Sequence, residues 1–218
     1  MVPARSFEQL RMAIKPTLLI VDIEGGELEL VRHARFDGVD RVVIELHPDV
    51  IGEDGCESVV TALGEASFKV TPELSSSDAV LAFTRAADPK VTTEVLVREA
   101  LAELPWQRAE RALTTLLEAI PPGASFVLLD DALWWRGGEF GDRDRRFLVE
   151  RDREDWGAPE DAAAAVAELH ARRAEGVRWL TVAWPAFWWL EDFPALAREL
   201  SGFPEIVRTR DVRIWKLG

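Results

Sequence analysis

The chain has 218 residues, of which 48% are hydrophobic and 30% charged, a composition that describes a globular protein with room for one large or two small domains. The formal net charge of -13 argues against a nucleic-acid partner, because phosphate binding needs clustered Lys and Arg. One cysteine, Cys56, excludes an intramolecular disulfide and a cysteine-based zinc site. No apolar run reaches membrane-spanning length and no leader pattern is found, so we expect a cytoplasmic protein without membrane insertion.

The first predicted elements surround the stretch LLIVDIEGGELE, which begins at Leu18. Residues 3–14 have helical spacing, with Ser6 as a candidate N-cap. Residues 18–21 are an apolar run typical of a buried parallel strand, and a turn with two acids and two glycines leads from it into a helix over 27–34. Residues 41–44 are β-branched and predict a second buried strand.

Polar side chains follow both of these strands. Asp22 and Glu24 follow the first strand, and Glu45 and His47 follow the second. Ligands of open α/β sheets bind beyond the carboxyl ends of the strands, so we expect three carboxylates and an imidazole to converge there. A base for a hydroxyl proton is one interpretation. One alternative is that Asp22 and Glu24 cap the next helix and Glu45 holds the turn. The other is that the cluster holds a hard cation, which we do not predict.

The rest of the first half contains weaker signals. We expect a polar loop over 48–55, a helix over 58–66, and an antiparallel edge hairpin formed by 68–71 and 79–84, with a serine-rich turn at 75–78 between its strands. Asp88-Pro89 breaks the pattern, so we place a domain boundary there, between domains 1–88 and 89–218.

The second half predicts another α/β unit. We expect one long helix, or two with a break at Pro105, over residues 93–119. Strands are expected at 126–129, 147–149 and 179–182, and helices at 158–173 and 193–200. The last two segments, 206–208 and 212–215, predict a terminal hairpin. Residues 134–146 are rich in glycine and charge and predict an exposed loop that carries Trp134 and Trp135.

Several motifs of the first half resemble the FkbM family of methyltransferases. They are PARSF from Pro3, LIVDIEGGE from Leu19, VVIELHP from Val42, and Leu63-Gly64 before a strand. The resemblance covers about residues 1–86 and matches the C-terminal half of the family's domain. It implies a partial methyltransferase sheet, S-adenosylmethionine as cofactor and a hydroxyl acceptor on a sugar or polyketide. It also implies that Asp22, Glu24, Glu45 and His47 lie at the acceptor end. The usual N-terminal half of the family's domain, which binds the cofactor, is not part of the resemblance.

The second half is similar to an α/β module that accompanies glycosyltransferases of bacterial polysaccharide systems. The similarity lies in a helix ending in Arg-Arg-x-x-Gly, the strand after it, and the stretch PAFWWLEDFP from Pro185. Trp184, Trp188 and Trp189 can form a platform for a sugar ring, although large aromatic side chains are more often core. Asp130 and Asp131 follow the strand at 126–129 and are candidate ligands of the cofactor's ribose.

The sequence therefore predicts an α/β protein of two small Rossmann-like modules, and it leaves two functional hypotheses. The leading one is O-methyl transfer to a hydroxyl of a sugar or secondary metabolite. The alternative is a non-catalytic module that binds carbohydrate or a glycosyltransferase in polysaccharide biosynthesis. Either hypothesis is compatible with a homo-oligomer, because an incomplete sheet leaves an edge that another chain can cover.

Overall fold

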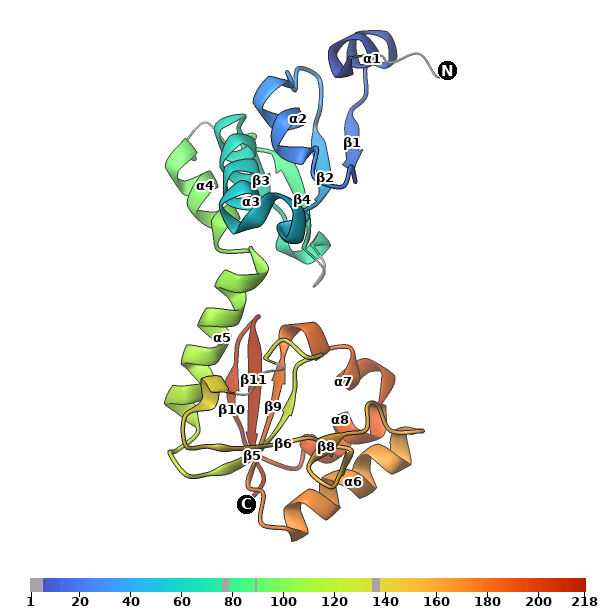
Figure 1. Cartoon of the computed structure of the whole chain (residues 1–218), viewed down its shortest axis with the longest axis vertical. Helices are drawn as coiled ribbons and strands as arrows, with labels where there is room; N and C mark the ends of the chain where they lie inside the picture. The colour runs from blue at the N-terminus through green and yellow to red at the C-terminus, as the bar shows by residue number, and fades with distance from the viewer. Residues whose placement is uncertain (1–5, 76–78, 89, 135–137) are drawn as a thin grey trace. The chain divides into compact units, whose positions relative to one another are not determined.

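The computed structural model describes residues 6–75, 79–88, 90–134 and 138–218 (Figure 1). The chain divides into two compact units, Met1–Arg108 and Ala109–Gly218. The division falls later than the Asp88-Pro89 boundary expected from the sequence, because the helix after that boundary packs into the first unit. A Cβ added to Gly64 would lie 2.7 Å from a methyl carbon of Val97, and Ala100 and Leu104 are buried in the first core.

The first unit contains a mixed sheet covered by helices. Its elements are α1 (Phe7–Ile14), β1 (Leu18–Val21), α2 (Glu27–His33), β2 (Arg41–Glu45), α3 (Pro48–Glu65), β3 (Phe68–Val70), the short helix η1 (Pro72–Leu74), β4 (Val80–Arg85), α4 (Thr93–Leu101) and the start of α5 (Pro105–Ala119). Among the described residues the strand order is β1-β2-β4-β3, with β1 and β2 parallel and β4 antiparallel to both neighbours. The antiparallel hairpin at one edge is therefore confirmed, although its turn at 76–78 lies outside the described residues.

Only one face of this sheet is packed against α2, α3 and α4 (Figure 1). The core on that face includes Val42 and Ile44 of β2 together with Val31, Val60 and Ala100 of the three helices. On the opposite face, Leu18 is 47% exposed and Ile20 is 75% exposed. The prediction of a fully buried first strand is therefore wrong, because β1 is an edge strand and no described helix covers its second face.

The segment 48–55 was expected to be a loop, and this prediction is also wrong. Helix α3 begins at Pro48, where a proline costs no helical hydrogen bond, and Gly52 bends the helix with a left-handed φ of +73°. Cys56 is buried in the same helix, and burial raises the pKa of its thiol to about 11.

The second unit contains a sheet that is covered on both faces. Its elements are the rest of α5, β5 (Ser125–Leu129), the short helix η2 (Gly138–Phe140), β6 (Asp144–Arg146), β7 (Glu150–Arg151), β8 (Glu154–Asp155), α6 (Ala162–Ala174), β9 (Trp179–Ala183), the short helix η3 (Trp184–Ala186), α7 (Trp189–Asp192), α8 (Pro194–Leu200), β10 (Glu205–Arg208) and β11 (Val212–Lys216). The described strands follow the order β10-β11-β9-β5-β6, and the terminal hairpin is confirmed.

Alternation along β5 divides the second core into two layers. Val127 and Leu129 pack with side chains of α6 and α8, whereas Phe126 and Leu128 pack with side chains of α5. β5 lies between β6 and β9 and runs parallel to both, so this central strand is buried on both faces.

Two predictions for residues 134–149 are wrong. The strand beside β5 is β6 at 144–146 rather than 147–149, because Ser125 donates a hydrogen bond to the Asp144 carboxylate and the Asp144 amide donates to the carbonyl of Ala124. Trp134 is buried rather than exposed, since its ring packs edge-on against Phe140. Trp135 lies outside the described residues.

The two units together confirm the predicted α/β class. None of the helices that the structure describes is both long enough and apolar enough to span a bilayer.

Candidate functional site

The acidic turn after β1 is pressed against the start of α3. Glu24 and Gly25 both have left-handed backbone, with φ of +50° and +102°. A Cβ on Gly25 would lie 2.5 Å from Cγ1 of Val50, closer than real atoms approach. The glycine therefore serves two physical needs, a positive φ and a close approach, and it brings the turn beside the residues that follow β2.

His47, which directly precedes α3, is held by Glu27 at the start of α2. Nδ1 of His47 lies 2.5 Å from Oε1 of Glu27. The same oxygen accepts a hydrogen bond of 3.2 Å from the amide of Gly25. Glu27 is fully buried, so its carboxylate fixes the position of the imidazole ring. In the tautomer that this contact favours, Nδ1 carries a proton and Nε2 has a lone pair available.

Glu27 is a candidate functional residue that we did not single out from the sequence. It lies within the motif LIVDIEGGE, but an acid at the first position of a helix already has a structural explanation, because it interacts favourably with the helix dipole. The signal that identifies it is spatial, since Glu27 and His47 are twenty residues apart and only the packing of α2 beside α3 joins them.

The three other predicted side chains, those of Asp22, Glu24 and Glu45, lie around His47. Nε2 of His47 lies 3.7 Å from Oδ1 of Asp22 and 3.6 Å from Oε2 of Glu24, and both carboxylates are exposed to solvent. The alternative that these two acids cap α2 is wrong, because the N-cap is Gly26 and no side-chain hydrogen bond caps that helix. Asp22 and Glu24 thus remain available to a ligand.

The pKa values of the central pair shift in opposite directions. The hydrogen bond that His47 donates to the Glu27 carboxylate raises the pKa of His47 above its usual value, and the charges of Glu24 and Glu45 act in the same sense. Burial opposes ionisation of Glu27, but its backbone hydrogen bonds and the bond to His47 outweigh burial and lower the pKa of this carboxyl. Both shifts stabilise the ion pair of carboxylate and imidazolium, so a neutral His47 binds a proton at Nε2 more tightly than an isolated histidine does.

The same cluster has the donor atoms of a cation site. One atom each from Asp22, Glu45 and His47 lies within 4.8 Å of the others. Two carboxylates and an imidazole can hold a divalent cation, and a buried carboxylate behind the imidazole is a common support for such a ligand. The arrangement can thus act on a hydroxyl group either as a base or through a cation.

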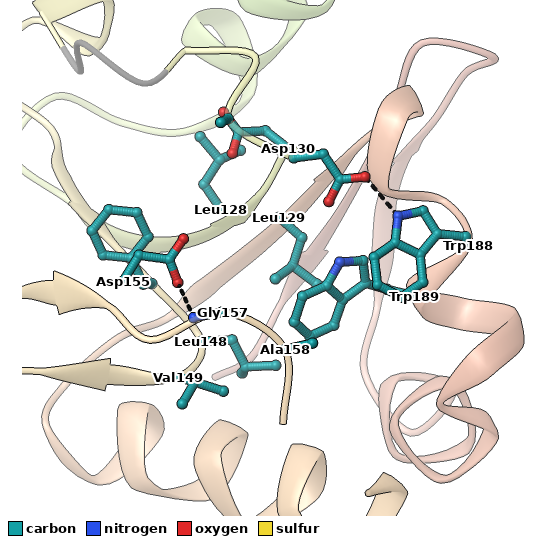
Figure 2. A pocket seen from close by; sticks show the side chains of 13 residues that line it. Leu128, Leu129, Asp130, Leu148, Val149, Asp155, Gly157, Ala158, Trp188 and Trp189 are labelled. Carbon is teal, nitrogen blue, oxygen red and sulfur yellow. Dashed lines mark hydrogen bonds between the residues drawn. The ribbon is translucent and has the colours of Figure 1, made fainter. Parts of the chain in front are cut away.

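The second unit has a cavity of about 150 Å³ that is lined by the carboxyl end of β5 and the start of α7, among other segments (Figure 2). Asp130 and Asp131, predicted as ribose ligands, both line it. Oδ2 of Asp130 accepts a hydrogen bond of 2.9 Å from the amide of Trp134. Burial nevertheless raises the pKa of the Asp130 carboxyl, because it outweighs that bond and the attraction of Arg145.

The backbone at this strand end is strained. Asp131 and Ala132 have φ of +46° and +63°, and neither is a glycine. Such a conformation costs on the order of 1–3 kcal/mol per residue and clusters at active sites and other functional segments.

The three predicted tryptophans do not form one platform. Trp188 and Trp189 line the cavity, whereas Trp184 is buried in the hydrophobic cluster of the α5 face. Its role as a sugar-binding residue is therefore wrong, since Pro185 and Ala186 in η3 turn the chain between it and the other two. Asp155 and the segment 147–149 complete the cavity and were not singled out from the sequence.

A buried ion pair fixes that segment. The Glu150 carboxylate lies 2.6 Å from Nη2 of Arg146 and 3.3 Å from Nη1 of Arg172, and it also accepts a hydrogen bond from the amide of Phe147. Leu148 and Val149 are thereby held as an apolar wall of the cavity.

Comparisons of the chain with protein-family models, with curated proteins and with solved structures find no match. Functional inference therefore depends on the motifs and on the geometry of these two sites.

Proposed function

We propose that the first unit is the acceptor end of an S-adenosylmethionine-dependent O-methyltransferase of the FkbM type, acting on a hydroxyl of a sugar or secondary metabolite. The observation that carries the proposal is the imidazole of His47, held at Nδ1 by the buried carboxylate of Glu27 and turned with Nε2 toward Asp22 and Glu24. We also propose that both units are Rossmann-like and that the protein is cytoplasmic. The parallel pair β1 and β2, with acids beyond its carboxyl ends, supports it.

When bound, S-adenosylmethionine supplies a methyl group on a positively charged sulfonium sulfur. The chemistry of the acidic cluster fits this end of the molecule, because Asp22 and Glu24 are exposed carboxylates that attract a cation. Asp130 and Asp131 belong to the second unit, and their role as ribose ligands stays a prediction from the sequence.

His47 acts as the general base. Its Nε2 would accept the proton of the acceptor hydroxyl, and the oxygen activated in this way would be the nucleophile for the methyl group that the cofactor would supply. The resulting imidazolium is stabilised by Glu27 at Nδ1. A positioned base of this kind accelerates proton transfer about 10²- to 10⁴-fold.

Calorimetric titration of the whole chain with S-adenosylmethionine and S-adenosylhomocysteine tests cofactor binding. We expect saturable heat with both ligands. No heat at millimolar ligand, from a chain shown to be folded by circular dichroism, overturns the proposal and favours the non-catalytic module.

Transfer of a radiolabelled methyl group to a panel of neutral glycosides tests the base. His47→Gln should reduce transfer by about 10²- to 10⁴-fold without weakening cofactor binding. His33→Gln is the matched control, since His33 is an exposed histidine of the same unit and should leave transfer unchanged. Full transfer by His47→Gln would remove His47 from the mechanism. A loss restored by added Mg²⁺ would instead assign the cluster to a cation.

A further inference from the structure

The cavity of the second unit has the walls of a binding site for one small ring (Figure 2). Leu129, Leu148 and Val149 form an apolar wall, and Trp188 and Trp189 form an aromatic one. The volume of about 150 Å³ is comparable to that of an engineered cavity that accommodates a benzene ring. The cavity is thus large enough for a single six-membered ring.

The aromatic wall is rigid and partly accessible. Trp188 is 38% exposed, and its indole Nε1 donates a hydrogen bond of 2.6 Å to Oδ2 of Asp131. Its ring centroid lies 5.4 Å from that of Trp189, with 37° between the ring planes. Asp131 therefore holds one indole face in place beside the cavity, and a fixed aromatic face is suited to the C–H face of a saturated ring.

An unused donor lies in the same wall. Trp189 is only 7% exposed, and its indole Nε1 is buried without a hydrogen-bond acceptor among the described residues. Figure 2 shows this nitrogen on the edge of the ring nearest Leu129, which also lines the cavity. A buried donor without an acceptor costs free energy, so an acceptor atom of a ligand in the cavity would stabilise this group.

The polar part of the lining is acidic. Asp130, Asp131 and Asp155 contribute carboxylates, and the described residues that line the cavity include neither Lys nor Arg. Such a lining repels phosphate and other anions and offers acceptors to hydroxyl groups. The ligand is therefore a donor of hydrogen bonds that carries no negative charge.

We propose that this cavity binds a neutral, hydroxyl-rich saturated ring, that is, an unphosphorylated monosaccharide unit. Its C–H face stacks on Trp188, its hydroxyls donate to the carboxylates of Asp131 and Asp155, and one of its oxygens accepts from Nε1 of Trp189. The site lies wholly within the second unit and stands independently of methyl transfer at His47.

Ligand-detected NMR on the full chain tests the chemical class of ligand. The panel consists of methyl glycosides of neutral hexoses, the corresponding hexose phosphates, and tetramethylammonium chloride. We expect saturable binding of at least one neutral glycoside, with its phosphate weaker by about tenfold or more. The proposal is overturned if no neutral glycoside binds at tens of millimolar, if a phosphate binds more tightly, or if only the ammonium ion binds.

Single substitutions test the location. Trp188→Ala should weaken glycoside binding by about tenfold, and Trp189→Phe, which keeps a ring but removes the donor, by about two- to tenfold. Trp156→Ala is the matched control, since Trp156 is an exposed tryptophan of the same unit that does not line the cavity.

Loss of folding is separated from loss of binding by Asp131→Asn. The amide oxygen of asparagine still accepts from Trp188, so the ring stays in place while the charge is removed. We expect weaker glycoside binding at an unchanged unfolding temperature. Unchanged binding by both Trp188→Ala and Asp131→Asn would overturn the assignment of the cavity.

Discussion

The two sheets show how similar apolar runs acquire different environments. LLIV in β1 and FVLL in β5 are both strand sequences, yet Ile20 in β1 is exposed whereas Phe126 in β5 is fully buried. The difference comes from the layers around each sheet, because β5 has helices on both faces and a strand on either side. An apolar run thus predicts a strand, but burial is decided by elements that lie elsewhere in the chain.

The buried acids of the two units differ in the same way. Glu27 and Asp130 both lie near the carboxyl end of a strand and are both buried. An imidazole and backbone amides stabilise the charge of Glu27 and lower its pKa, whereas burial dominates at Asp130 and raises its pKa. The hydrogen-bond partners, rather than burial alone, decide the direction of the pKa shift.

The largest expected effect is a difference in stability between a variant of β5 and a variant of β1. Phe126→Ala should lower the free energy of unfolding of the second unit by about 3–5 kcal/mol, because it leaves a cavity beside Phe140. Ile20→Ala should lower that of the first unit by less than about 1 kcal/mol, because the side chain is already in water. Urea unfolding followed by circular dichroism measures both. Equal costs would contradict the one-sided packing of β1.

A substitution in the turn after β1 should destabilise the first unit more than a substitution on the exposed face of β1. Gly25→Ala requires a left-handed alanine and moves Val50, so we expect a loss of about 1–3 kcal/mol in the stability of the first unit. Gly38→Ala is the control, since Gly38 has a positive φ of +79° and open space around it, and it should cost less. Thermal unfolding of the two variants gives the difference, and a larger loss at Gly38 would argue against the close approach.

The charge pair of the first unit can be broken by Glu27→Gln. This change removes the hydrogen bond to the carboxylate, so the pKa of His47 should fall, as measured by NMR titration of the imidazole. Glu29→Gln, on the exposed side of α2, should leave the pKa of His47 unchanged. An unaltered pKa of His47 in Glu27→Gln would contradict the pairing.

The same pair predicts a pH dependence of stability. The contribution of His47 is complete below its unfolded pKa of about 6.5 and is lost as the pH rises through its raised pKa in the folded state. The contribution of Glu27 is present above about pH 4.3 and is lost as the pH falls through its lowered pKa. The pair therefore stabilises the first unit most between these values, and Glu27→Gln should flatten the profile.

The smallest effect is expected at Asp130. Its raised pKa means that the second unit loses stability as the pH rises from about 3.9 through the folded-state value. Asp130→Asn keeps an acceptor for the Trp134 amide and removes this loss, so its advantage over the parent chain should grow with pH. Tryptophan-detected urea unfolding measures the trend, with Asp192→Asn on the surface of α7 as control. An advantage that shrinks with pH would contradict the raised pKa.

Much of the fold could be predicted from local patterns. The strands β1, β2, β5 and β9 are compact apolar runs, and Pro105 separates α4 from α5 as expected. The errors are at segments whose structure depends on distant contacts. Residues 48–55 contain two glycines and read as a loop, yet Gly55 is the residue that fits closely against Ile51 within α3.

The candidate sites were predicted in part for the same reason. Strand ends are recognisable in a sequence, so the convergence of Asp22, Glu24 and His47 could be predicted. Glu27 could not, because its partner is remote in the chain. Trp184 and Trp188 are only four residues apart, yet Trp184 lies in the core and Trp188 lines the cavity, because η3 turns the chain between them. The amino-acid composition of the segment does not predict this difference.

The buried thiol of Cys56 and the tryptophans of the second unit allow the opening of each unit to be measured separately. The chain contains one thiol, which lies in α3 of the first unit, and eight of its nine tryptophans follow residue 130, in the second. A thiol that is buried with a pKa of about 11 reacts with an alkylating reagent only when the surrounding core opens. The rate of alkylation therefore reports opening of the first unit, and indole fluorescence reports unfolding of the second. Comparison of the two signals shows whether the units open together, without any added fluorophore.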